Sequence, residues 1–249
     1  MRSLIILSFV FCLISTPSLS ADPFSLSALS SSTDAAGNTT YSLSLQILVL
    51  MSAITVLPSL VLGMTAFTRI IIVLSILRQA LGTQQTPPNQ VLIAIALSLT
   101  ATVMTPTFQR VYDESATPYL AETMGAEEAL SIGGAIMKDF MVINTRKDSL
   151  IIFSDLANSK PFASNADIPF SVILPAFITS ELKTAFQIGF LIFLPFLVID
   201  MVISSILMSL GMMMLSPMLI SLPFKLLLFV LVDGWSMMSA SLVSTFVTP

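Results

Sequence analysis

The sequence contains no histidine and a single cysteine, Cys12, so most side chains that catalyse reactions or bind metals at neutral pH are missing. Without imidazole there is no side chain whose unperturbed pKa lies near pH 7. Zinc sites built from histidine and cysteine, thiol nucleophiles in a mature chain and intrachain disulfides are equally excluded. The phosphate-binding pattern Gly-x-x-x-x-Gly-Lys is also absent. We therefore expect neither an enzyme nor a bound cofactor.

Charge is scarce as well. Only 10% of the 249 residues are charged and 55% are hydrophobic, whereas ordinary soluble domains carry about 25% charged residues. The charges also cluster: residues 110–167 hold five basic and nine acidic side chains, which accounts for the net charge of −4. This pattern indicates one water-facing segment between two membrane-embedded blocks. It offers no basic surface for nucleic acid.

The N-terminus has the features of a secretory signal. Arg2 supplies a positive start, and residues 4–14 form an apolar run too short to span a bilayer. Ser18-Leu19-Ser20 then places small residues at the positions that decide cleavage. We predict a cleavable signal peptide over residues 1–20, with a short first transmembrane helix as the alternative. Residues 21–42 are rich in serine and threonine and are expected to be a flexible lead-in.

The first membrane block is predicted over residues 43–110. Residues 43–63 are long and apolar enough to span, but one continuous helix over residues 46–81 would be about 54 Å long at 1.5 Å per residue, well beyond a hydrocarbon core of about 30 Å. Pro58 and Gly63 are therefore expected to bend or break it.

A Gly- and Pro-rich turn over residues 82–88 leads to a second helix, predicted over residues 89–110. Arg69 and Arg78 lie between the two spans, so the positive-inside rule places this connection in the cytoplasm. The acidic segment, residues 111–167, then falls in the periplasm as a small, mostly helical subdomain.

The second membrane block, residues 168–249, is expected to form a helical hairpin with passages at about 184–210 and 220–246. The predicted fold is thus an all-α integral membrane protein. It has about four apolar helical passages, arranged as kinked hairpins, and a small helical periplasmic subdomain.

The second block contains few charged side chains. A charge at the centre of a membrane helix costs about 2.5–3.5 kcal/mol on insertion scales, so such groups usually find partners or water. No two of these residues are spaced to pair along one helix, so we expect Glu181–Lys225 or Asp200–Lys225 contacts across segments or subunits, with exposure at the interface as the alternative. The charged residues of the block are Glu181, Lys183, Asp200, Lys225 and Asp233.

Methionines are concentrated near the hairpin turn. Three interpretations remain open from the residues alone: adaptable packing of lipid- or core-facing positions, a deformable seal around a passage, or soft thioether ligands for Cu(I). The residues concerned are Met201, Met208, Met212, Met213, Met214 and Met218.

Three stretches resemble the FliP family of flagellar type III export-gate proteins. They are FTRIIIVLSILRQALG with PPNQV (67–82 and 87–91), PAFITSELKTAFQIGF (175–190), and LGMMMLSPM running into PFKLLLFVLVDGW (210–218 and 223–235). The resemblance implies a pore-forming core subunit of the flagellar export gate in the bacterial inner membrane. About five copies would assemble in the basal body with two other small membrane subunits and further export-apparatus proteins. Unfolded flagellar proteins would be the substrates.

The resemblance also implies roles for particular residues. Met212, Met213 and Met214 match a methionine-rich loop that forms a gasket around the closed pore. Glu181 and Lys225 match positions that form an intersubunit ion pair. The alternatives are a small-solute or copper permease that uses the methionine cluster, and the equivalent subunit of a virulence type III secretion system.

Overall fold

The computed structural model describes residues 32–33, 39–40, 43–83, 85–157, 162, 164–212 and 215–247. The expected signal peptide, most of the lead-in and two of the three gasket methionines, Met213 and Met214, lie outside these residues. The chain divides into two compact units, residues 1–56 and 57–249. In the first, strands β1 (Ser32–Thr33) and β2 (Thr39–Thr40) pair antiparallel, and helix α2 (Leu43–Gly63) begins.

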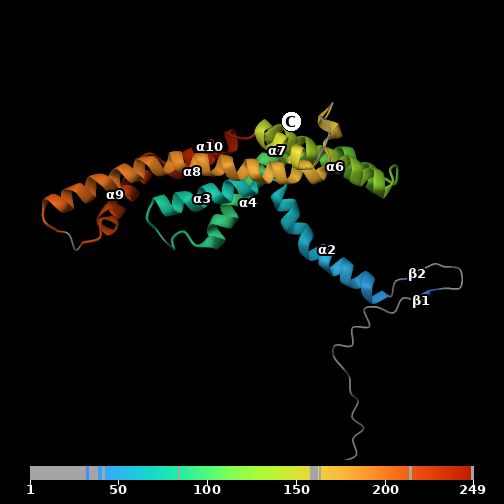
Figure 1. Ribbon diagram of the computed structural model, residues 1–249, viewed down its shortest axis with the longest axis horizontal. Coiled ribbons are helices and arrows are strands. Elements are labelled where there is room, and N and C mark those ends of the chain that lie inside the picture. The colour runs from blue at the N-terminus through green and yellow to red at the C-terminus, as the bar shows by residue number, and fades with distance from the viewer. Residues whose placement is uncertain are drawn as a thin grey trace, which may run out of the picture. The chain divides into compact units, whose positions relative to one another are not determined.

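The second unit is built from helices throughout its described part, which confirms the all-α prediction (Figure 1). Its elements are α3 (Phe67–Ala80), α4 (Asn89–Val111), the π-helix η1 (Tyr112–Ala116), α5 (Thr117–Leu120), α6 (Ala126–Asn144), α7 (Lys147–Leu156), the 3-10 helix η2 (Asn165–Asp167), α8 (Phe170–Ser209), α9 (Pro217–Leu231) and α10 (Gly234–Ser244).

Two stretches, Asn89–Leu120 and Phe170–Ser209, are long and apolar enough to cross a membrane as single helices. Two further pairs meet the same test together but are bent, by 71° between Met51–Gly63 and Phe67–Ala80 and by 65° between Pro217–Leu231 and Gly234–Ser244. With each bent pair counted as one passage, the described residues contain up to four spans, in agreement with the predicted four.

Several predicted boundaries differ from the observed helices. The expected break at Gly63 is confirmed, because α2 ends there, whereas Pro58 lies inside α2 without ending it. The second helix, predicted to end at residue 110, continues through η1 and α5 to Leu120. The passage predicted over 220–246 is two helices, because Asp233 adopts a left-handed backbone conformation that ends α9.

The core lies where α3 packs along α8. Ile70, Val73, Leu74 and Leu77 of α3 are spaced as one helix face and are almost completely buried. The two helices approach closely at Gly189, since a Cβ atom there would lie 2.4 Å from Ile76 Cδ1. Small residues allow membrane helices to approach in this way.

The acidic segment is helical, as predicted, and its helices pack on the rest of the unit. Helix α6 packs on α4 and α8, and α7 packs on α8, all within the unit 57–249. Phe140 and Met141 of α6 are fully buried, and the Phe140 ring meets Phe177 of α8 edge-on with 6.1 Å between centroids. The apolar face of α6 therefore completes the common core. Its periplasmic location stays a prediction.

Candidate functional site: buried charges and the methionine loop

Arg69 of α3 and Glu181 of α8 form a bidentate ion pair inside the helix bundle. Arg69 Nε donates to Glu181 Oε2 at 2.8 Å and Nη2 donates to Oε1 at 2.5 Å, and the side chains are 4% and 0% exposed. Arg69 Nη1 also donates to the carbonyl and hydroxyl oxygens of Thr245, both at 3.0 Å. The guanidinium carbon lies 3.8 Å from the ring centroid of Phe246. The pair thus joins α3, α8 and the end of α10.

This geometry corrects the expectation for Arg69. The sequence places Arg69 with Arg78 in a cytoplasmic connection, but Arg69 is buried and its charge is compensated by Glu181. The positive-inside rule counts basic residues in loops, so only Arg78 can contribute to it. Arg78 does lie beside the α3–α4 connection, where its Nη1 donates to Asn89 Oδ1 at 2.6 Å and to the Pro87 carbonyl at 3.3 Å.

A second ion pair joins the α8–α9 hairpin to α3. Lys225 Nζ lies 2.7 Å from Asp200 Oδ2 and donates to the Ala80 carbonyl at 3.1 Å. The Ser221 hydroxyl donates to the other Asp200 oxygen at 2.6 Å. Ala80 ends α3, and carbonyls in the last turn of a helix lack intrahelical partners, so a lysine there satisfies one of them. The expected Asp200–Lys225 contact is therefore present within one chain.

The other expected contact, Glu181–Lys225, is not formed within the chain, because each residue has its own partner there. Glu181 is paired with Arg69, and Lys225 with Asp200. An ion pair between copies that uses Glu181 and Lys225 stays a prediction. Arg69 could not be foreseen as the partner of Glu181, since 112 positions separate them in the sequence.

Two further anchors were not foreseen from the sequence. The Asn144 side chain, at the end of α6, accepts a hydrogen bond from the Val247 amide at 3.1 Å and donates to the Val247 carbonyl at 3.0 Å. The Arg146 amide donates to Ser180 Oγ at 2.9 Å, and its side chain bonds Thr184 and Gln187 of α8. No sequence periodicity signals such contacts, because each joins residues far apart in the chain.

The methionine loop begins where α8 is stopped by a glycine. Gly211 has φ of +74°, its amide donates to the Met208 carbonyl at 3.1 Å, and the Met212 amide donates to the Leu207 carbonyl at 3.0 Å. This double hydrogen bond is the Schellman motif that ends many helices. Met212 is 46% exposed, and Pro217 starts α9. The motif therefore places Met212 in the turn between α8 and α9.

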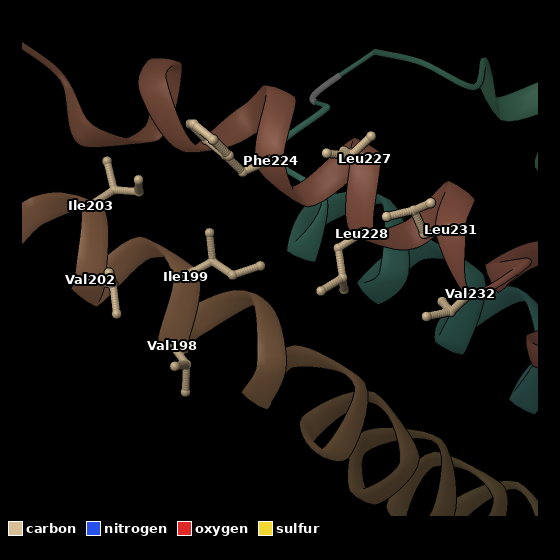
Figure 2. A pocket seen from close by; sticks show the side chains of 9 residues that line it. All are labelled: Val198, Ile199, Val202, Ile203, Phe224, Leu227, Leu228, Leu231 and Val232. Atoms are coloured by element: carbon tan, nitrogen blue, oxygen red, sulfur yellow. The ribbon is translucent and has the colours of Figure 1, made fainter.

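An entirely apolar groove of about 480 Å³ lies between α8 and α9 (Figure 2). Its position could not be predicted, because both helices are apolar on nearly every side and show no contrast between faces. The lining residues are Val198, Ile199, Val202 and Ile203 of α8, and Phe224, Leu227, Leu228, Leu231 and Val232 at α9.

The remaining predicted site residues, Lys183 and Asp233, are both exposed. Lys183 lines a hollow on α8 with Phe186, Gln187, Phe190 and Leu191, and Asp233 occupies the bend between α9 and α10. Neither has an ion-pair partner within the described part of the chain. The structure thus pairs Arg69 with Glu181 and Lys225 with Asp200. Among the described residues, Arg78, Lys183 and Asp233 form no ion pair.

Residues 50–242 match the model of the FliP family, a range that includes α3, α4, α8, α9 and the methionine loop. The chain belongs to the FliP family. Over 214 residues it is 69% identical to the flagellar biosynthetic protein FliP of Cereibacter sphaeroides, an alignment that covers 86% of this chain and 71% of that protein. It is 52% identical to the protein of the same name from Pectobacterium carotovorum over 210 residues, 84% and 81% of the two chains.

The FliP of Bacillus subtilis is 50% identical over 201 residues, which are 81% of this chain and 91% of that one. These FliP relatives carry a flagellar name, which favours the flagellar interpretation over a virulence secretion system. Membership of the FliP family likewise favours protein export over a copper permease as the use of the methionine run. All the buried charges described above lie within the matched range. Thr245 and Val247, which bond Arg69 and Asn144, lie just beyond it.

Proposed function

We propose that this protein is a pore-forming core subunit of the flagellar type III export gate and passes unfolded flagellar proteins across the bacterial inner membrane. The main observation in support of this proposal is the match to the FliP family over residues 50–242. By resemblance to that family, about five copies assemble with two other small membrane subunits and with the wider export apparatus. The role is a conduit, not an enzyme.

The way charge is distributed supports a membrane-embedded assembly. The ion pairs Arg69–Glu181 and Lys225–Asp200 neutralise the charges that lie between helices. The surfaces of α8 and α9 expose large apolar side chains instead, including Phe190 at 64% and Val230 at 72%. Soluble proteins rarely expose so large an apolar surface, so lipid or neighbouring subunits are its natural environment.

We assign the pore seal to the loop that contains Met212, Met213 and Met214. Methionine side chains are flexible and polarisable, so a ring of them can close around an empty passage and still yield to chains of different sequence. Hydrophobic constrictions of this kind block ions by excluding water. The position of Met212 at the tip of the α8–α9 hairpin, on a turn fixed by Gly211, supports this assignment.

The export role is tested in the source bacterium by deletion of the gene and restoration of the full chain from a plasmid. We expect the deletion strain to grow normally, to lose the flagellar filament protein from its medium and to regain it with the plasmid. Normal secretion of filament protein by the deletion strain would contradict the proposed function.

The seal is tested separately with two matched triple variants. Replacement of Met212, Met213 and Met214 by alanine should leave the complex assembled but make the cells leak small ions, which is measured with an ion-sensitive dye. Replacement of Met201, Met208 and Met218, which are 61%, 69% and 49% exposed outside the 212–214 run, should not. Equal leakage from both variants, or none from the first, would remove the gasket assignment.

A further inference from the structure

Lys183 and Asp233 stand out because each is charged, exposed and set in an apolar helix surface. The other charges of the second membrane block, Glu181, Asp200 and Lys225, are paired within the chain. An unpaired charge inside a bilayer is costly and is normally matched by a partner or by water. One cation and one anion therefore remain to be matched from outside this chain.

The surroundings of Lys183 resemble the centre of a protein contact. It lies in a hollow of about 580 Å³ whose other walls include Phe186 and Phe190, 60% and 64% exposed. Gln187, the polar neighbour in the hollow, is already bonded by Arg146. An apolar rim around one charged group excludes water once a partner docks, which strengthens an ion pair at its centre.

Asp233 has a carboxylate that its own helix does not use. It is the N-cap residue of α10, a position where aspartate usually accepts a hydrogen bond from the first helical turn. Here no such bond is formed, and the backbone adopts the left-handed conformation with φ of +48°. Leu231 and Val232 beside it are 76% and 49% exposed. The bend thus presents a carboxylate with an apolar rim.

We propose that Lys183 of one copy pairs with Asp233 of the neighbouring copy. The proposal rests on the assembly named under the proposed function, and it adds a second contact between copies to the predicted pair of Glu181 and Lys225. Those two residues are buried and already paired within their chain, whereas Lys183 and Asp233 are exposed and complementary. The two surfaces differ, so the contact is head-to-tail and repeats from one copy to the next.

The positions of the two residues also define an offset between copies. Lys183 lies 17 residues before Asp200 on α8, and Asp233 lies eight residues after Lys225, which is paired with Asp200. Since α9 runs back along α8, the positions of Lys183 and Asp233 along the α8 axis of one copy differ by about 14 Å at 1.5 Å per residue. Neighbouring copies would be displaced along α8 by about this amount.

A disulfide test uses the full chain in its native membrane, with Cys12→Ser as the background. Lys183→Cys combined with Asp233→Cys should give a ladder of reductant-sensitive oligomers on oxidation, while either cysteine alone should give monomer. The control pair is Asp233→Cys with Leu156→Cys, which replaces a leucine that is 71% exposed on α7 and should not cross-link. A test pair that cross-links no more than the control would overturn the proposal.

A charge-swap test checks the pair without cysteines. Lys183→Asp and Asp233→Lys alone should each lower the assembled fraction on native gels about fivefold or more, and the double variant should return to within about twofold of the unsubstituted chain. Single variants that assemble normally would overturn the ion pair and indicate that both charges reach water. Because secretion by the unsubstituted chain is measured in parallel, such a result leaves the export role standing and is distinguishable from its failure.

Discussion

The Arg69–Glu181 ion pair offers the sharpest prediction of what holds the bundle together. Arg69→Met would leave the Glu181 carboxylate, 0% exposed, without a counter-charge. Removal of one partner from a buried ion pair costs about 3–5 kcal/mol, because the other charge stays buried and uncompensated. For a chain of this size, that loss corresponds to a fall in the thermal midpoint of about 6–20 °C.

The double variant Arg69→Met with Glu181→Leu separates the ion pair from simple loss of packing. Replacement of both charges by apolar side chains of similar size is often close to neutral. The Thr245 carbonyl would lose its donor, but the Thr245 hydroxyl keeps its bond to the Leu242 carbonyl at 2.7 Å. We therefore expect the double variant to lose only about 1–3 kcal/mol, so that it is more stable than Arg69→Met alone.

The assay is thermal unfolding of the detergent-purified full chain, followed by the loss of monodisperse protein on size-exclusion chromatography. The matched control is Arg110→Met, which breaks the ion pair between Arg110 and Glu114. The side chains of these two residues are 38% and 51% exposed. Exposed pairs of this kind contribute about 0–1 kcal/mol, so the midpoint should barely change. If the double variant is at least as unstable as Arg69→Met, the loss in the single variant does not come from the uncompensated charge of Glu181.

The remaining predictions concern three other contacts, each checked by the same unfolding assay. Asp200→Asn should destabilise the protein more than Lys225→Met does. The first variant leaves Lys225, whose side chain is 3% exposed, without a counter-charge, whereas the second leaves Asp200, which is 33% exposed and can be hydrated. The reverse order of stability would contradict this. Gly234→Ala should cost about 1–3 kcal/mol, since the new Cβ would lie 2.3 Å from the Phe229 ring, while Gly125→Ala, with no atom within 4 Å, should have little effect. Equal midpoints for the two glycine variants would argue against the tight corner. Asn144→Ala removes two hydrogen bonds to Val247 and should cost about 1–3 kcal/mol of stability. It should also speed proteolysis of the chain's C-terminal end. An unchanged cleavage rate would show that these hydrogen bonds do not hold that end in place.

The class of the fold could be predicted because it depends on local composition. Long apolar runs with Gly63 at one break and Gly82 and Pro87 at the first turn locate the helices of the first block. The start of α8 was placed too late, at about residue 184 instead of Phe170. Glu181 and Lys183 interrupt the apolar run, but Glu181 is neutralised by Arg69 from a distant segment, so the helix continues through it.

The site could be predicted only in part, because several of its contacts join residues that are far apart in the sequence. Charges in apolar segments indicate that partners exist, and this led to the Asp200–Lys225 contact. They do not identify the partner when it is far away in the sequence, as Arg69 is from Glu181 and Asn144 is from Val247. The positive-inside rule also takes no account of whether a basic residue is buried, as Arg69 is.

The central claim, that the α8–α9 hairpin tip lines the path of the exported chain, is tested most directly by photo-cross-linking. A photoreactive amino acid replaces Met212 in cells whose export is stalled by a substrate with a folded domain at its C-terminus, and the cross-linked products are probed for that substrate. We predict a strong adduct from position 212 and none from position 156 on α7, which is also exposed. Absence of an adduct at position 212, or equal adducts at both positions, would contradict the account.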